Sequence, residues 1–230
     1  MEQLVFDLAS PPPPTLENFL PGCNAEVLAA VARFAAADTR ETSLVLWGAP
    51  GGGKTHLLRA TVAAAVNTQA ASYYAGPNAL PMVPVDANVL LAVDDVESAN
   101  APAQGQLFTL YNKLAASGAR VVVAAALPPA RMQLRDDLRT RLSSGLIYEI
   151  LPLADADKAA ALEAHARARG FVLAEDVIAY LFAHGRRDMP SLLALLAALD
   201  RHALATKRAV TVPLLKSWLQ RAEAAANMRE

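Results

Sequence analysis

The sequence has a single cysteine, Cys23, among its 230 residues. One thiol cannot form a disulfide within the chain, and no cysteines and histidines are paired at the spacing of a zinc site. Aromatic residues are also few, at 6%. Alanine supplies much of the apolar content, and because it favours helices and buries little area, we expect many closely packed helices.

Long apolar runs and a strong charge imbalance are missing as well. No uninterrupted apolar stretch reaches the roughly 20 residues of a membrane-spanning helix. The first residues lack the basic start and apolar core of a secretory signal. The formal net charge of −1 gives no overall attraction to nucleic acid or to an anionic membrane surface. We therefore expect a cytoplasmic protein without a membrane partner.

Strand-like and helical patterns alternate through the first two thirds of the chain, and only helical patterns follow. The expected strands are residues 43–47, 72–75, 89–95, 120–125 and 147–151. The expected helices are residues 24–37, with Asn24 as the cap, 55–67, 104–116, 136–142, 155–169, 175–183, 191–205 and 212–222. This order predicts an α/β fold in which a parallel sheet has helices on both faces and a small all-helical domain follows.

A glycine-rich segment joins the first expected strand to the next helix: Gly48-Ala49-Pro50-Gly51-Gly52-Gly53-Lys54-Thr55. It matches the P-loop pattern G-x-x-x-x-G-K-[ST] in the structural context that the pattern requires. The glycines let backbone N–H groups approach phosphate oxygens, Lys54 adds a positive charge, and the Thr55 hydroxyl holds Mg²⁺. The motif predicts that the chain binds ADP or ATP together with Mg²⁺.

The patterns divide the chain into three parts. Residues 1–14 form an extended N-terminal peptide with a proline-rich spacer, because Pro11 to Pro14 favour an extended conformation. Residues 15–151 form the nucleotide-binding domain. Residues 152–230, where the strand pattern has ended, form a helical lid.

Two aspartates, Asp94 and Asp95, end the strand expected at residues 89–95. A P-loop ATPase uses one acidic group there for the magnesium shell and another to orient the attacking water. We assign Asp94 to the metal and Asp95 to the water, with a turn capped by two aspartates as the alternative. Many such ATPases carry the longer glutamate at the second position, so the sequence supports nucleotide binding more than hydrolysis.

Three further segments carry a family resemblance: residues 15–22, residues 106–113, and residues 140–142 followed by 145–148. Together with the P-loop and the paired aspartates, they resemble the AAA+ domain of the DnaA/Hda family of bacterial replication initiators and their regulators. The regulators are the more similar, and the resemblance spans nearly the whole chain. It implies an AAA+ sheet with a helical lid, in which Phe19 and Leu20 help to cover the adenine.

The resemblance also assigns two arginines. Arg141 matches the arginine finger, whose guanidinium reaches a γ-phosphate across an interface and raises phosphoryl-transfer rates by roughly 10³- to 10⁵-fold. Arg187, followed by Asp188 and Met189, matches a phosphate-contacting arginine of the lid. A solvated basic surface is the alternative for each arginine.

One departure from the family concerns the end of the strand at residues 120–125. The family has a polar side chain there that senses the γ-phosphate, whereas residues 124–127 of this chain are Ala-Ala-Ala-Leu. We therefore expect weak or no ATP hydrolysis by the chain itself, with the nucleotide acting as a structural ligand.

The apolar residues before the proline run have no neighbouring element to cover them. Gln3, Leu4, Phe6 and Leu8 resemble short peptides that dock on the bacterial DNA polymerase sliding clamp. Leu4, Phe6 and Leu8 would enter an apolar pocket, and Gln3 would make polar contacts at its edge. The alternative is an edge strand that folds back on the chain's own sheet.

The resemblance implies a regulator of replication initiation. It would bind the sliding clamp, reach DNA indirectly through the clamp, and stimulate hydrolysis of DnaA-bound ATP with Arg141. One alternative is an initiator or loader ATPase that hydrolyses its own ATP and binds DNA, although little sequence follows the lid for a DNA-binding module. Another is a nucleotide-gated adaptor without activating function. Formation of a homo-oligomer is compatible with each.

Overall fold

The computed structural model describes residues 12–80, 89–184, 188–206 and 210–217. Within them the chain forms two compact units, one from Pro13 to Leu153 and another that contains the residues from Ala154 onward. No helix in these ranges is long and apolar enough to cross a lipid bilayer.

The first unit is built on a sheet of five parallel strands in the order β2-β3-β4-β1-β5. The strands are β1 (Ser43–Trp47), β2 (Ala70–Tyr74), β3 (Val89–Val93), β4 (Arg120–Ala125) and β5 (Leu146–Glu149). The predicted parallel sheet is confirmed. Because β3, β4 and β1 are neighbours and run in the same direction, the loops that follow them meet at one edge of the sheet.

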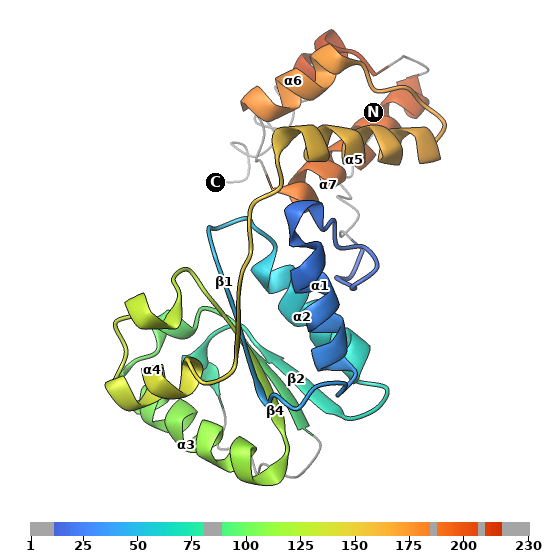
Figure 1. Cartoon of the computed structure of the whole chain (residues 1–230). Coiled ribbons are helices and arrows are strands. Elements are labelled where there is room, and N and C mark those ends of the chain that lie inside the picture. The colour runs from blue at the N-terminus through green and yellow to red at the C-terminus, as the bar shows by residue number, and fades with distance from the viewer. Residues whose placement is uncertain (1–11, 81–88, 185–187, 207–209, 218–230) are drawn as a thin grey trace, which may run out of the picture. The chain divides into compact units, whose positions relative to one another are not determined.

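Helices cover both faces of this sheet (Figure 1). The helices α1 (Ala25–Ala35) and α2 (Lys54–Ala65) pack on one face, and α3 (Ala101–Ser117) and α4 (Asp136–Leu142) pack on the other. Strand β1 shows why both faces are apolar. Its Leu44 and Leu46 join the core under α1 and α2, whereas Val45 joins the core under α3 and α4, because successive strand side chains point to opposite faces.

Asn24 stands at the start of α1 but does not cap it, so that prediction is wrong. Its side-chain nitrogen donates to the Leu151 carbonyl oxygen and its Oδ1 accepts from the Leu151 N–H, both at 2.8 Å. A carboxamide can donate and accept at once, so it completes the hydrogen bonding of the backbone just after β5. The predicted fifth strand accordingly stops at Glu149.

The sequence pattern did not predict a buried charge at Arg120, the first residue of β4. Arg120 is 5% exposed, and its guanidinium donates to the Phe34 carbonyl oxygen and to Gln69 Oε1. It also lies over the Phe34 ring, 5.6 Å from the centroid. Burial lowers the pKa of Arg120, and no carboxylate among the described residues pairs with it. The side chain links β4 to α1 and to the residue before β2.

The second unit contains helices and connecting loops, and no strand, among the residues that the structure describes. Its elements are α5 (Asp155–Ala168), α6 (Glu175–His184) and α7 (Met189–Thr206), and residues 212–217 are also helical. Leucines such as Leu162, Leu181 and Leu196 form its core. The helix α7 begins two residues earlier than predicted, because Asp188 Oδ1 accepts from the Ser191 N–H at 3.0 Å and caps its first turn.

Candidate functional site

The P-loop runs from the end of β1 to the start of α2, and its backbone requires glycine at both ends. Gly48 has a φ of +149°, and a Cβ there would lie 2.3 Å from the Ile150 carbonyl oxygen. Gly53 has a φ of +101°, and a Cβ there would lie 2.7 Å from Phe19 Cε2. The loop therefore needs glycine where its backbone packs closely against neighbouring residues. It ends at the N-terminus of α2, where backbone N–H groups can bind phosphate.

Lys54 is the first residue of α2, and its side chain bends back over the loop. Its Nζ donates to the carbonyl oxygens of Gly48 and Ala49 at 2.7 and 3.0 Å. Burial lowers the pKa of Lys54, and this is partly offset by the carboxylates of Glu97, Asp94 and Asp95, in decreasing order of effect. The ammonium thus stands among three negative groups at the phosphate-binding edge.

The structure brings Thr55 and Asp94 into contact, and their assignment to Mg²⁺ stays a prediction. Thr55 Oγ1 donates to Asp94 Oδ2 at 2.6 Å, and Asp94 is buried. The same Oδ2 accepts from the Tyr73 hydroxyl at 3.1 Å, and Oδ1 accepts from the Asp95 N–H at 3.1 Å. Tyr73 is a site residue that the sequence reasoning missed, because only the pairing of β2 with β3 brings it beside Asp94.

These residues fit a nucleoside di- or triphosphate with Mg²⁺. The glycine cradle leaves room for phosphate oxygens at the backbone, and a hydroxyl beside a carboxylate is a donor set that suits Mg²⁺ when phosphates supply further oxygens. The part of the chain that the structure describes holds no group of three or more His, Cys, Asp or Glu side chains that could bind a metal alone. The ion would therefore depend on the nucleotide for part of its shell.

Asp95 follows Asp94 in an uncommon backbone conformation, with a φ of +46°. Its side chain is exposed. Burial of part of the group raises the pKa of Asp95, as do the nearby charges of Asp94 and Glu97. The water-orienting role assigned to Asp95 stays a prediction.

A second carboxylate that the sequence reasoning missed lies near Asp95. Glu97 belongs to the short 3₁₀ turn Val96–Ser98, and its Oε1 accepts from the Ala126 N–H at 2.7 Å. Ala126 directly follows β4, where the sequence offers only apolar side chains. A carboxylate from another loop thus lies at that strand end. Its spacing from Asp94 in the sequence does not by itself identify Glu97 as a site residue.

The segment before α1 packs on the P-loop. Phe19 is buried against Gly53 and lies 5.5 Å from the His56 ring, centroid to centroid. His56 Nε2 lies 2.9 Å from the Thr15 carbonyl oxygen, which ties α2 to the same segment. Leu20 is 37% exposed. The adenine contacts assigned to Phe19 and Leu20 stay predictions.

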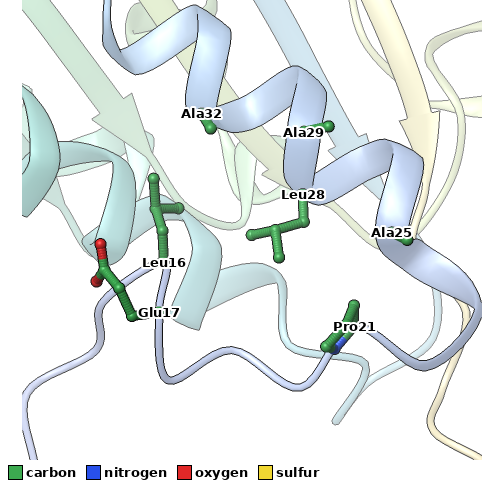
Figure 2. A pocket seen from close by; sticks show the side chains of 7 residues that line it. All are labelled: Leu16, Glu17, Pro21, Ala25, Leu28, Ala29 and Ala32. Atoms are coloured by element: carbon green, nitrogen blue, oxygen red, sulfur yellow. The ribbon is translucent and has the colours of Figure 1, made fainter.

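An open groove of about 390 Å³ lies between α1 and the segment that precedes it (Figure 2). Small and apolar side chains form most of its walls, and Glu17 adds a carboxylate. None of the P-loop residues lines it. Because its walls offer no positive charge to phosphate, we place the nucleotide at the P-loop and not in this groove.

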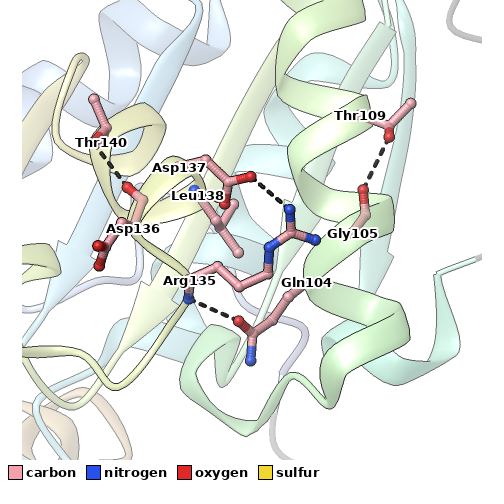
Figure 3. Close-up of polar contacts among 8 residues, drawn as sticks. All are labelled: Gln104, Gly105, Thr109, Arg135, Asp136, Asp137, Leu138 and Thr140. Atoms are coloured by element: carbon pink, nitrogen blue, oxygen red, sulfur yellow. Dashed lines mark hydrogen bonds and ion pairs between the residues drawn. The ribbon is translucent and has the colours of Figure 1, made fainter.

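The helix α4, which carries Arg141, is held by its neighbours through other residues. Arg135 N–H donates to Gln104 Oε1 of α3 at 2.9 Å, and its guanidinium pairs with Asp137 at 2.6 Å (Figure 3). Arg139 pairs with Asp136 at 2.6 Å. Both arginines are therefore paired with carboxylates of α4 itself.

Arg141 itself is exposed. Its guanidinium has no hydrogen bond or ion pair with the residues that the structure describes. Arg141 thus differs from Arg135 and Arg139, which are both paired with carboxylates. The sequence alone does not show this difference.

Several predicted site residues lie outside the described residues. They are Arg187 of the lid and Gln3, Leu4, Phe6 and Leu8 of the N-terminal peptide. Their assigned roles stay predictions.

The sheet order, the P-loop after β1, the acidic residues after β3 and the following helical unit define an AAA+ protein. The family model of the bacterial DnaA ATPase domain matches residues 84–149, and that of the Hda lid domain matches residues 155–219. The chain belongs to the DnaA/Hda family of AAA+ proteins.

Solved structures share this fold. Domain III of the Thermotoga maritima replication initiation protein DnaA is 22% identical with a TM-score of 0.74, covering 91% of this chain and 97% of its own. AMPPCP-bound DnaA from Aquifex aeolicus is 22% identical with a TM-score of 0.66, covering 82% and 66%. A single-site variant of Thermotoga maritima RuvB is 15% identical with a TM-score of 0.66, covering 90% and 72%.

Proposed function

We propose that this protein turns down replication initiation by stimulating hydrolysis of the ATP bound to DnaA. It does so in trans, by placing the Arg141 guanidinium at the γ-phosphate of that nucleotide. The guanidinium neutralises charge that develops on the phosphoryl oxygens in the transition state. The amount of ATP-bound DnaA would then fall, which would limit further initiation.

The state of Arg141 is the observation that carries this proposal. The side chain of an arginine finger must reach another subunit without losing a strong ion pair in its own subunit. It must also be carried by an element that is packed firmly on the protein core. Arg141 is exposed and unpaired among the described residues, whereas Arg135 and Arg139 have carboxylate partners. The buried Leu138 and Leu142 anchor α4 on the sheet, so the helix presents Arg141 from a packed base.

The chain's own nucleotide site fits the same role. The P-loop, Thr55 and Asp94 would hold ADP or ATP with Mg²⁺, and Phe19 and Leu20 would cover the adenine. Arg187 of the lid would contact a phosphate. A bound nucleotide would also stabilise the folded protein by mass action.

The N-terminal peptide would bring the protein to DNA-loaded clamps. Gln3, Leu4, Phe6 and Leu8 would dock on the clamp, and burying Leu or Phe contributes about 1.5–3 kcal/mol for each side chain before the cost of ordering. A clamp has repeated subunits, so several copies on one ring would gain avidity. The local concentration of Arg141 near DnaA would rise accordingly.

The test measures turnover of DnaA-bound ATP with this protein and a DNA-loaded clamp. Arg141→Ala should reduce stimulation by roughly 10³-fold or to the unstimulated rate, while clamp and nucleotide binding persist. Arg139→Ala is the matched control, because it removes an equal charge from the same helix, and it should retain most of the stimulation. Full stimulation by Arg141→Ala would remove the finger from the mechanism.

A separate measurement addresses the clamp. Replacing Leu4 and Phe6 by alanine should abolish clamp binding in surface plasmon resonance and leave nucleotide affinity unchanged. Retained clamp binding would show that the peptide is not the docking element. Direct, salt-sensitive DNA binding by the isolated chain would instead favour an initiator or loader.

A further inference from the structure

Glu97 is anchored at the edge of the nucleotide site by one of its two carboxylate oxygens. Its Oε1 accepts from the Ala126 N–H at 2.7 Å. Ala126 follows the last residue of β4, and Glu97 lies in the 3₁₀ turn after β3, so the bond joins two neighbouring strand ends. The preceding Val96 is fully buried and holds the turn in place. The carboxylate is therefore preorganised.

The other oxygen of the same carboxylate has no protein partner. Glu97 Oε2 is shielded from solvent and forms no hydrogen bond with any residue that the structure describes. Buried polar atoms are almost always paired, and an exception calls for a ligand, a water or a chemical role. Here the free acceptor stands at a candidate phosphate site.

The Glu97 carboxylate raises the pKa of Lys54 more than the carboxylates of Asp94 and Asp95 do. The Gly48 N–H of the P-loop donates to the Ala125 carbonyl oxygen at 3.2 Å, and the next residue, Ala126, donates to Glu97. Glu97 therefore lies at the end of β4 that adjoins the P-loop, where the terminal phosphate would bind. Asp95 has a shorter side chain, an exposed position and a left-handed backbone. Glu97 is thus better placed than Asp95 to hold a water against that phosphate.

We propose that this chain hydrolyses ATP itself, in contrast to the weak or absent hydrolysis expected from the apolar end of β4, and that Glu97 is its catalytic carboxylate, in the role that the sequence assigns to Asp95. Glu97 Oε2 accepts a hydrogen bond from a water molecule and takes its proton as the water oxygen bonds to the γ-phosphorus. The bond between that phosphorus and the β,γ-bridging oxygen breaks, and ADP leaves with the electron pair. The proton passes from Glu97 to the released phosphate or to solvent, which restores the carboxylate.

The test is single-turnover hydrolysis of ATP with the full chain in excess, at several protein concentrations, without DnaA or a clamp. Glu97→Gln should lower the rate by at least about 100-fold, because general-base catalysis contributes that much or more. The glutamine oxygen can still accept from the Ala126 N–H, so the ATP affinity and the melting temperature should stay near their wild-type values. If Glu97 had only a structural role, Glu97→Gln would lower the melting temperature and leave the hydrolysis rate of the folded protein unchanged.

Asp95→Asn and Glu163→Gln are the comparison variants. Asp95→Asn should lower the rate by less than about tenfold, and Glu163→Gln, which neutralises an exposed lid residue, should not change it. If Glu97→Gln does not fold, Glu97→Asp keeps the charge but retracts it from the water, and it should also lose most of the rate.

Three results would overturn the proposal. They are a wild-type rate in Glu97→Gln, an equal loss in Asp95→Asn, and no hydrolysis by the wild-type chain at any concentration. None of these outcomes bears on Arg141, so failure here is distinguishable from failure of the proposed action on DnaA.

Discussion

Tyr73→Phe should weaken the binding of magnesium-bound nucleotide and leave magnesium-free binding nearly unchanged. The substitution removes one hydroxyl, which donates to Asp94 Oδ2 at 3.1 Å. It keeps the aromatic ring, over which Arg59 lies 4.8 Å from the centroid. The variant therefore removes the hydrogen bond to the metal-side carboxylate and, with it, the interaction of the hydroxyl with Arg59.

The magnitude follows from the partners of Asp94. Its carboxylate accepts from Thr55, Tyr73 and the Asp95 N–H, and Tyr73→Phe leaves two of these three donors. A hydrogen bond to a charged group contributes about 1.5–3 kcal/mol, and loss of a partner of a metal ligand typically costs 10- to 100-fold in metal affinity. A tenfold change in affinity corresponds to about 1.4 kcal/mol. Both estimates therefore predict that the affinity for magnesium-bound nucleotide falls at least about tenfold.

The hydroxyl remains a donor at neutral pH. Burial is the largest cause that raises the pKa of Tyr73 above its ordinary value, and Asp94 raises it further. The assay is calorimetric titration with ADP, once with excess Mg²⁺ and once with a chelator. Tyr74→Phe is the control, since Tyr74 is the next residue on β2 and packs in the core on the other side of the sheet. Equal weakening with and without Mg²⁺, or none at all, would refute the assignment of Asp94 to the metal.

Three other substitutions test separate features. Arg120→Ala should lower the free energy of unfolding by roughly 3 kcal/mol in urea titrations, because it leaves the Phe34 carbonyl and Gln69 Oε1 buried without a donor; a cost below about 1 kcal/mol would show that the arginine is dispensable. Gly53→Ala should abolish nucleotide binding, because its Cβ would lie 2.7 Å from Phe19, and unchanged affinity would refute the cradle geometry. Asp95→Asn should raise the melting temperature at pH 7. The pKa of Asp95 is raised by folding, so its ionisation opposes folding, and the gain should disappear below the unfolded pKa near pH 4; a gain that persists at pH 3 would contradict this.

Local pattern was sufficient for most of the fold. The strands at residues 43–47 and 120–125 and the helix at residues 136–142 have the predicted bounds. Each strand is a short, nearly continuous apolar run, and the helix places Leu138 and Leu142 on one face. The P-loop was recognisable for a similar reason, since its chemistry requires adjacent residues. Asn24 is the clearest local error, because its partner Leu151 lies 127 positions away.

Sequence alone determined the class of protein: a parallel sheet with a phosphate-binding loop, paired aspartates at a strand end, and a helical unit after it. Each of these features is encoded within a few consecutive residues. Only the tertiary structure decided which side chains surround the site. The contacts of Tyr73 with Asp94, of Glu97 with Ala126 and of Arg120 with Phe34 join residues 21, 29 and 86 positions apart. Such contacts depend on strand order and helix packing, which no short stretch of sequence specifies.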